Sequence, residues 1–180
     1  MTSALLVIDF QRGLIDDEPR PGDVERTTEN INVLMANARR AGVPVVLIQH
    51  EDHRGLVRDS SPWELARELQ AGAGDFRVGK RTPDSFLGTE LQSLLTSLGV
   101  KHIVVCGYAS EFCVDTTVRR AAALGYPVTI AADAHTTHDK PHAKAAQIRE
   151  HHNATLSDIG SFGPKIRAVP VASLDFNALA

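Results

Sequence analysis

The chain has 180 residues, of which 43% are hydrophobic and 23% charged, with a formal net charge of −3 and a pI near 6.2. This length fits one globular domain, which we place over residues 1–180, and the composition provides enough apolar side chains for a sizeable core. The small negative charge and the absence of any run of Lys or Arg argue against a polyanion-binding protein, so we expect no nucleic-acid partner.

Short apolar runs alternate with longer amphipathic segments, which predicts strands alternating with helices. In chain order, the predicted elements are a strand at 4–10, a helix at 24–41, a strand at 43–49, a loop at 51–61 leading into a short helix at 62–65, a strand at 76–80, a helix at 88–98, a strand at 101–107, a helix at 114–124, a strand at 127–132, a helix at 141–151 and a last strand at 169–174. This alternation predicts an α/β fold with a mainly parallel six-stranded sheet and helices on both faces.

Neither a membrane segment nor a leader is expected. The longest apolar runs, such as 4–8 and 103–106, are too short to cross a bilayer, which excludes a membrane partner. The first residues lack a basic region, and Asp9 interrupts the first apolar run, so we predict no signal peptide and a cytoplasmic location. The two cysteines, Cys106 and Cys113, have neither CxxC nor zinc-ligand spacing, which favours free thiols in a reducing compartment.

Three chemically active segments fall at predicted strand ends. Asp9 closes the first strand, Lys80 closes the third, and the turn 107–113 follows the fourth. In open parallel sheets ligands bind beyond the carboxyl ends of the strands. The sequence therefore predicts that Asp9, Lys80 and Cys113 meet at one edge of the sheet.

The two thiols are expected to differ. Cys106 lies inside the strand and is predicted to be a small core residue. Cys113 opens a helix, where the free N–H groups favour a thiolate, lower the thiol pKa and can receive an oxyanion. Position alone leaves open whether Cys113 is a nucleophile or a buried cysteine at the start of a core helix.

Asp9 and Lys80 also have two interpretations each. Asp9 is either a solvated loop charge or a general base that takes the thiol proton and later protonates a leaving amine. Lys80 belongs either to a solvated basic loop or beside Asp9 and Cys113, where its cation would stabilise carboxylate and thiolate. The conjunction of the three favours the catalytic interpretation.

The chain resembles the isochorismatase-like, or cysteine hydrolase, superfamily, which includes nicotinamidases and N-carbamoylsarcosine amidase. The resemblance extends through residues 133–134, and its motifs stand in the family's order at 5–11 (LLVIDFQ), 80–86 (KRTPDSF) and 107–114 (GYASEFCV). It implies a three-layer α/β/α fold, a Cys113–Asp9–Lys80 triad, and a cis peptide bond between Tyr108 and Ala109. That bond would turn the Ala109 N–H toward an oxyanion, beside the N–H of Cys113. It also implies a homo-oligomer, either a dimer or a tetramer.

Two departures narrow the expected activity. Isochorismatases that cleave a vinyl ether usually lack the cysteine, so Cys113 favours covalent amide chemistry. Nicotinamidases carry an Asp-x-His metal motif, which residues 49–53 (QHEDH) do not reproduce. Together with residues 60–65 (SSPWEL), this stretch resembles the branch near streptothricin hydrolase, which opens a lactam.

We expect no metal and no cofactor. Of the eight histidines, His138 and His142 are spaced four apart, but Pro141 lies between them, and a catalytic zinc takes three suitable ligands. Whether a metal lies near His50 and His53, or near His135 and His138, stays open at this point. The residues predicted to contact substrate, all in loops at strand ends, are Gln11, Trp63, Phe86, Tyr108 and His135.

The predicted function is cysteine-dependent hydrolysis of an amide or lactam C–N bond in a small molecule, through a thioester on Cys113 and an oxyanion held by the N–H groups of Ala109 and Cys113. One alternative is a non-catalytic small-molecule binding protein. Another is an isochorismatase-type ether hydrolase whose activity does not need the thiol.

Overall fold

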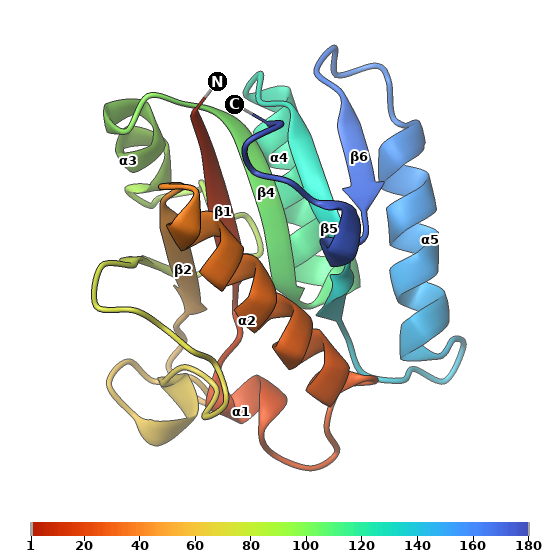
Figure 1. Cartoon of the computed structure of the whole chain (residues 1–180). Helices are drawn as coiled ribbons and strands as arrows, with labels where there is room; N and C mark the ends of the chain where they lie inside the picture. The colour runs from red at the N-terminus through yellow and green to blue at the C-terminus, as the bar shows by residue number, and fades with distance from the viewer. Residues whose placement is uncertain (1, 180) are drawn as a thin grey trace.

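Six parallel strands form one sheet in the computed structural model, which describes residues 2–179 (Figure 1). The strand order across the sheet is β3-β2-β1-β4-β5-β6. The strands are β1 (Thr2–Ile8), β2 (Val45–His50), β3 (Phe76–Lys80), β4 (Val100–Tyr108), β5 (Val128–Thr136) and β6 (Ile166–Val169). The prediction of an α/β fold with a parallel six-stranded sheet is confirmed.

Helices cover both faces of the sheet, which gives three layers (Figure 1). One face packs against α2 (Val24–Arg40) and the C-terminal segment with its short helix η3 (Val171–Ser173). The other face packs against α3 (Leu91–Ser97), α4 (Asp115–Ala123) and α5 (Ala145–Asp158). The remaining short helices are α1 (Arg12–Ile15), η1 (Ser61–Trp63) and η2 (Ser110–Val114).

The central strand β1 shows why the apolar run at its position is continuous. Leu5 and Val7 enter the core beneath α2, whereas Leu6 and Ile8 enter the core on the opposite face. Alternate side chains of a strand point to opposite faces, so a strand covered on both sides must be apolar throughout. None of the helices within residues 2–179 is long and apolar enough to cross a membrane.

Two elements near the C-terminus differ from their prediction. The helix predicted at 141–151 begins instead at Ala145, because the Asp139 carboxylate accepts from the Ala145 N–H at 2.9 Å and the Gln147 side chain accepts from the Lys144 N–H at 2.9 Å. The strand predicted at 169–174 is wrong: β6 covers 166–169 and ends before Pro170, which has no N–H for the ladder.

Two smaller differences concern short helices. The turn α1 was not predicted, because four residues carry too little periodicity to signal a helix. The helix predicted at 114–124 is preceded by a five-residue π-helical turn, η2, which contains Cys113.

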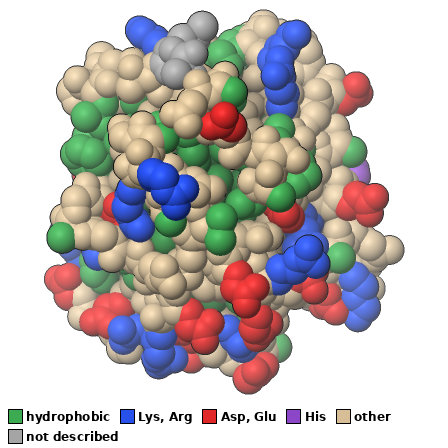
Figure 2. Space-filling model, in the orientation of Figure 1, with side chains coloured by type: hydrophobic (Ala, Val, Ile, Leu, Met, Phe, Trp, Pro, Cys, Tyr) green, Lys and Arg blue, Asp and Glu red, His purple; other side chains and the backbone are tan. Residues whose placement is uncertain are grey.

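Acidic and basic side chains intermingle on the face shown in Figure 2, with hydrophobic side chains between them. The functional interest of the fold lies at the carboxyl ends of β1 to β4, where the turns after the strands come together.

Candidate active site

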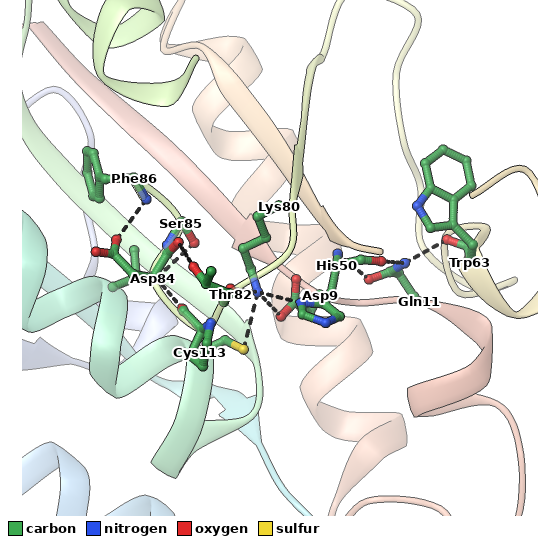
Figure 3. A network of polar contacts seen from close by, with 12 residues as sticks. Asp9, Gln11, His50, Trp63, Lys80, Thr82, Asp84, Ser85, Phe86 and Cys113 are labelled. Atoms are coloured by element: carbon green, nitrogen blue, oxygen red, sulfur yellow. Dashed lines mark hydrogen bonds and ion pairs between the residues drawn. The ribbon is translucent and has the colours of Figure 1, made fainter. Parts of the chain in front are cut away.

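Asp9, Lys80 and Cys113 meet beyond the strand ends, as Figure 3 shows. The Nζ atom of Lys80 lies 2.7 Å from Asp9 Oδ2 and 3.2 Å from Cys113 Sγ. Asp9 and Lys80 are 71 residues apart in sequence, and Lys80 and Cys113 are 33 apart. The predicted convergence of these three side chains at one sheet edge is therefore present in the structure.

Backbone geometry brings Asp9 to this point. The strand β1 stops at Ile8, and Asp9 adopts a left-handed conformation with φ of 48°, which aspartate tolerates better than most residues. Its N–H donates to the carbonyl of Ile48 at 2.8 Å, so the turn stays tied to β2.

A glycine allows β1 and β4 to approach closely at the same edge. Gly107 has φ of 117°, and a Cβ atom there would lie 2.2 Å from the carbonyl oxygen of Ile8. No side chain fits that space, because the obstacle is backbone. Gly107 therefore lets the turn that carries Cys113 lie beside the turn that carries Asp9. The peptide bond between Tyr108 and Ala109 is cis.

Lys80 reaches the other two residues by crossing the end of β2. His50 and Lys80 are register partners, and the Lys80 ammonium lies 3.4 Å from His50 Nδ1. It also donates to the carbonyl of Thr82 at 3.1 Å. The side chain of Lys80 is fully buried and that of Asp9 is 2% exposed. An ammonium has three donors, so Asp9, Thr82 and Cys113 account for all of them.

Burial disfavours the charged forms of Asp9 and Cys113, two side chains that Lys80 contacts. The pKa of Asp9 is raised chiefly by burial, although the Lys80 cation counteracts that rise. Asp9 Oδ1 is buried and has no hydrogen-bond partner among residues 2–179. Burial, followed by the negative charge of Asp9, raises the pKa of Cys113 to about 12, and Lys80 counteracts the rise.

This corrects the expectation that the start of a helix lowers the pKa of the Cys113 thiol. Although η2 runs directly into α4, the thiol is mostly removed from water beside a carboxylate, and these two effects outweigh that of the helix dipole. The resting group is a neutral thiol with an acceptor and a cation beside it.

A cavity of about 390 Å³ opens over Asp9 and Cys113, and the fully buried Lys80 side chain lies behind its wall. Its walls come from β1–α1, the end of β2 and the turn after β4. The lining residues are Asp9, Gly13, Leu14, His50, Asp52, Gly55, Leu56, Pro83, Tyr108, Ala109, Phe112 and Cys113. The wall is mainly apolar with a few polar groups, which suits a small organic ligand.

A larger hollow of about 640 Å³ lies on the other side of Phe112. It is lined by side chains of η2, α5 and the loop before α5, including Glu111, Lys140 and His151. Asp9, Lys80 and Cys113 do not line it, so we assign the chemistry to the smaller cavity.

Of the five residues predicted to contact substrate, Tyr108 lines the cavity. Gln11 does not: its amide donates to the carbonyls of His50 and Trp63 at 2.9 and 2.8 Å, and accepts from the His50 N–H. It holds the end of β2 against the loop that contains η1. The predicted substrate contact of Gln11 is not supported, because its side-chain amide is engaged by backbone groups away from the cavity.

The other three also lie away from the cavity. Phe86 is buried in the core and stacks on Tyr126. His135 is buried, and its two ring nitrogens contact Ser110 Oγ at 2.8 Å and Asn153 Oδ1 at 2.9 Å. Trp63 lies in η1, in a separate surface hollow with Arg77. Position in a strand-end loop does not say which way a side chain points, and these three point elsewhere.

Several cavity residues were not predicted, notably His50, Asp52 and Phe112. His50 is the last residue of β2, so the strand-end rule that selected Asp9 and Lys80 also applies to it. Burial, followed by the Lys80 cation, lowers the pKa of His50 below its usual range. Nothing in the sequence marks Asp52 or Phe112, because loop geometry brings them to the cavity.

The histidines do not assemble into a ligand set. Within residues 2–179, no three His, Cys, Asp or Glu side chains gather closely enough to hold a metal ion. The ring nitrogens of His138 lie 2.8 Å from the Tyr108 hydroxyl and 2.7 Å from the carbonyl of Pro19. They tie the turn after β4 to the N-terminal part of the chain.

Several known proteins are similar to this chain over most of its length. A streptothricin hydrolase from Streptomyces noursei is 34% identical over 176 residues, 93% of this chain and 64% of that protein. The secreted isochorismatase effector Isc1 of Verticillium dahliae is 34% identical over 160 residues, 87% of this chain and 84% of that protein. Nicotinamidase 3 of Arabidopsis thaliana is 30% identical over 177 residues, 89% of this chain and 81% of that protein.

The fold has solved counterparts. The crystal structure of an isochorismatase family protein superposes with a TM-score of 0.85 at 32% identity, covering 93% of this chain and 97% of the other. The isochorismatase domain family matches residues 3–159. This match spans β1 to α5 and includes Asp9, Lys80 and Cys113. The chain belongs to the isochorismatase family.

Proposed function

We propose that this protein hydrolyses an amide or lactam C–N bond of a small molecule through a thioester on Cys113. The observation that carries the proposal is the buried Lys80 ammonium, which joins a carboxylate at 2.7 Å to a thiol at 3.2 Å on the wall of a cavity. The names of two relatives, streptothricin hydrolase and nicotinamidase, support hydrolysis of this kind.

The first step is acylation. Asp9 accepts the proton of Cys113, and the sulfur attacks the carbonyl carbon, so that an S–C bond forms and the C=O electron pair moves to oxygen. The N–H groups of Ala109 and Cys113 donate to this oxyanion. Backbone N–H groups that donate to such an oxyanion stabilise the charge that develops as the sulfur attacks.

The pKa values support a proton transfer coupled to attack. A thiol with a pKa of about 12 is protonated at neutral pH, so it needs a base at the moment of reaction. Burial raises the pKa of Asp9, which makes that carboxylate a stronger base than an exposed one. Lys80 stabilises the thiolate as it forms.

The second half releases both products. Asp9 gives its proton to the nitrogen, the C–N bond breaks, and the amine leaves (or, in a lactam, stays attached through the ring). Water then loses a proton to Asp9 and attacks the thioester carbonyl. The S–C bond breaks, the sulfur regains the proton, and a carboxylic acid leaves. One water is consumed for each C–N bond cleaved.

A panel of small amides and lactams tests the proposal. Turnover should leave an acyl adduct on Cys113, seen by mass spectrometry of quenched reactions. Cys113→Ala should lose activity by about a thousandfold or more, because the sulfur that forms the thioester is removed. Cys106→Ala is the matched control and should keep it. A Cys113→Ala protein with full amidase activity would refute the covalent scheme.

Three further expectations belong to this proposal. The chain acts as one hydrolase domain, it forms a dimer or tetramer, and it works in the cytoplasm without a cofactor. The location is the expectation most in need of a test, because one relative is named as a secreted effector. Fractionation of cells that produce the full-length protein would decide it.

A further inference from the structure

We propose that Asp52 selects ligands by charge, so that the cavity favours amides bearing a neutral or cationic group and disfavours those bearing a carboxylate. The part of this inference that concerns substrates rests on the proposed function. As a statement about the potential at Cys113, it can be tested without turnover.

The ionisable side chains on the cavity wall are the basis of this proposal. The carboxylates and the imidazole that line it are those of Asp9, Asp52 and His50, and no Lys or Arg is among the lining residues. Tyr108 and Cys113 also line it, and the pKa of each is raised to about 12. Asp9 is paired with the buried Lys80 ammonium at 2.7 Å, so these two charges offset each other. Burial and the Lys80 cation lower the pKa of His50, which disfavours its charged form. The wall therefore carries one uncompensated charge, and it is negative.

Asp52 is held in place by the loop that follows β2. Its Oδ1 atom accepts from the backbone N–H groups of Arg54, Gly55 and Leu56 at 2.7, 2.7 and 3.0 Å. These three donors hold the pKa of Asp52 at about 2, so the group is ionised throughout the physiological range. Oδ2 takes part in none of these bonds, which leaves one carboxylate oxygen for a ligand.

Nearby arginines do not cancel this charge at the wall. Arg81 and Arg58 are about 70% exposed and face Glu51 at 2.9 and 3.9 Å. Arg54 is exposed as well, and it does not line the cavity. Asp52 is exposed too, but it lines the cavity and these arginines do not, so a ligand inside the cavity lies closer to the Asp52 charge than to theirs.

On the far side of Phe112, the Lys140 ammonium is already paired with the Glu111 carboxylate. The Lys140 ammonium lies 5.2 Å from the Phe112 ring and 3.1 Å from Glu111 Oε1. Phe112 separates this pair from the smaller cavity. A carboxylate on a ligand next to Cys113 therefore finds Asp52 and no free cation.

The first experiment measures the potential at Cys113 directly. Two methanethiosulfonates of similar size, one with a trimethylammonium and one with a sulfonate, are reacted with the protein. In each, the Cys113 sulfur forms a new S–S bond, the reagent's S–S bond breaks, and methanesulfinate leaves. We expect the cationic reagent to be favoured, and Asp52→Asn to reduce the ratio of the two rates about fivefold.

The variant keeps the loop intact by design, because the asparagine carbonyl still accepts the three N–H groups and only the charge is lost. Asp59→Asn is the matched control: Asp59 is an exposed carboxylate of the same loop region outside the cavity. A change in thiol pKa affects both reagents equally, so it cancels in the ratio. If Asp52→Asn unfolds, the wild-type ratio still tests the proposal, since salt should drive it toward one.

The second experiment compares hydrolysis of three benzamides that carry a methyl, an aminomethyl or a carboxylate group at the para position. We expect kcat/KM to be lowest for the carboxylate, and Asp52→Asn to narrow the gap. Equal reagent rates in the wild type, or a ratio unchanged in Asp52→Asn, would overturn the charge selection. A clear reagent ratio with no hydrolysis of any amide would instead count against the proposed function alone.

Discussion

The inside of β4 and the turn that follows it hold the two cysteines of this chain in opposite settings. Cys106 is fully buried between the layers, and its sulfur faces the carbonyl of Leu6 at 3.6 Å. Cys113, seven residues on, adjoins Lys80 and lies on the wall of a cavity. Both are free cysteines.

Burial raises the pKa of both thiols, so a raised pKa does not distinguish them. The two thiols differ in the side chains that surround them and in their access to solvent. The strand interior surrounds Cys106 with apolar side chains, whereas the turn places a carboxylate, an ammonium and a solvent-connected cavity at Cys113. A parallel sheet offers such groups at its carboxyl edge, because every turn there comes from a different strand.

The sharpest test of this comparison is alkylation. With iodoacetamide, we expect Cys106 to react at least about a thousandfold more slowly than Cys113, because it becomes accessible only when the structure opens. The Cys113 rate should rise about tenfold per pH unit from pH 7 to 10, as the thiolate fraction grows below a pKa of about 12. Peptide mapping gives both rates.

Protein unfolded in urea is the control, and there the two cysteines should react alike. Comparable labelling of Cys106 and Cys113 in the folded protein would remove the basis of the comparison.

The second test concerns the buried ion pair that distinguishes the turn from the strand interior. Asp9→Asn or Lys80→Met alone should destabilise the fold by about 3 kcal/mol or more, because each leaves a buried polar partner uncompensated. The double variant should cost clearly less than the sum of the single changes. Urea unfolding measures all three free energies, and strict additivity would contradict the coupling. Lys80→Met should also slow Cys113 alkylation about tenfold.

The third test concerns His135, a titratable residue near another strand end that is used to hold the fold together. His135 lies near the end of β5, yet both ring nitrogens are used within the fold, and burial lowers its pKa to about 4. The neutral ring therefore stabilises the fold fully above the unfolded pKa of about 6.5, and this stability is lost as pH falls toward about 4.

His135→Gln should remove that pH dependence, which amounts to about 3 kcal/mol between pH 7 and pH 4. Denaturant unfolding at both pH values, for wild type and variant, gives the difference. If the two proteins lose stability in parallel over this range, His135 does not stay neutral in the fold.

The smallest expected effect is the loss of stability when each cysteine is replaced by alanine. Cys106→Ala should cost about 1 kcal/mol, because the removed sulfur leaves a small void in a closed core. Cys113→Ala should cost less, since its side chain faces the cavity. Thermal melting of the two variants makes the comparison, and a larger loss for Cys113→Ala would reverse it.

Sequence periodicity was sufficient for much of the fold. The strand predicted at 76–80 coincides with β3, and the helix predicted at 24–41 differs from α2 by one residue. Boundaries set by side-chain contacts were harder to predict: Asp139 and Gln147 decide where α5 begins, and no periodic pattern marks them.

The residues of the proposed triad were predictable because a charge at the end of an apolar strand is a local signal, and parallel topology then brings such ends together. Asp9 and Lys80 carry that signal, and Cys113 follows the fourth strand in the same way. Which neighbouring side chains face the cavity was decided only by the folded loops. Gln11 and His135 turn inward to satisfy buried polar groups, whereas Asp52 is turned to the cavity wall by three backbone N–H groups. These directions depend on contacts between segments far apart in the chain, which no local pattern encodes.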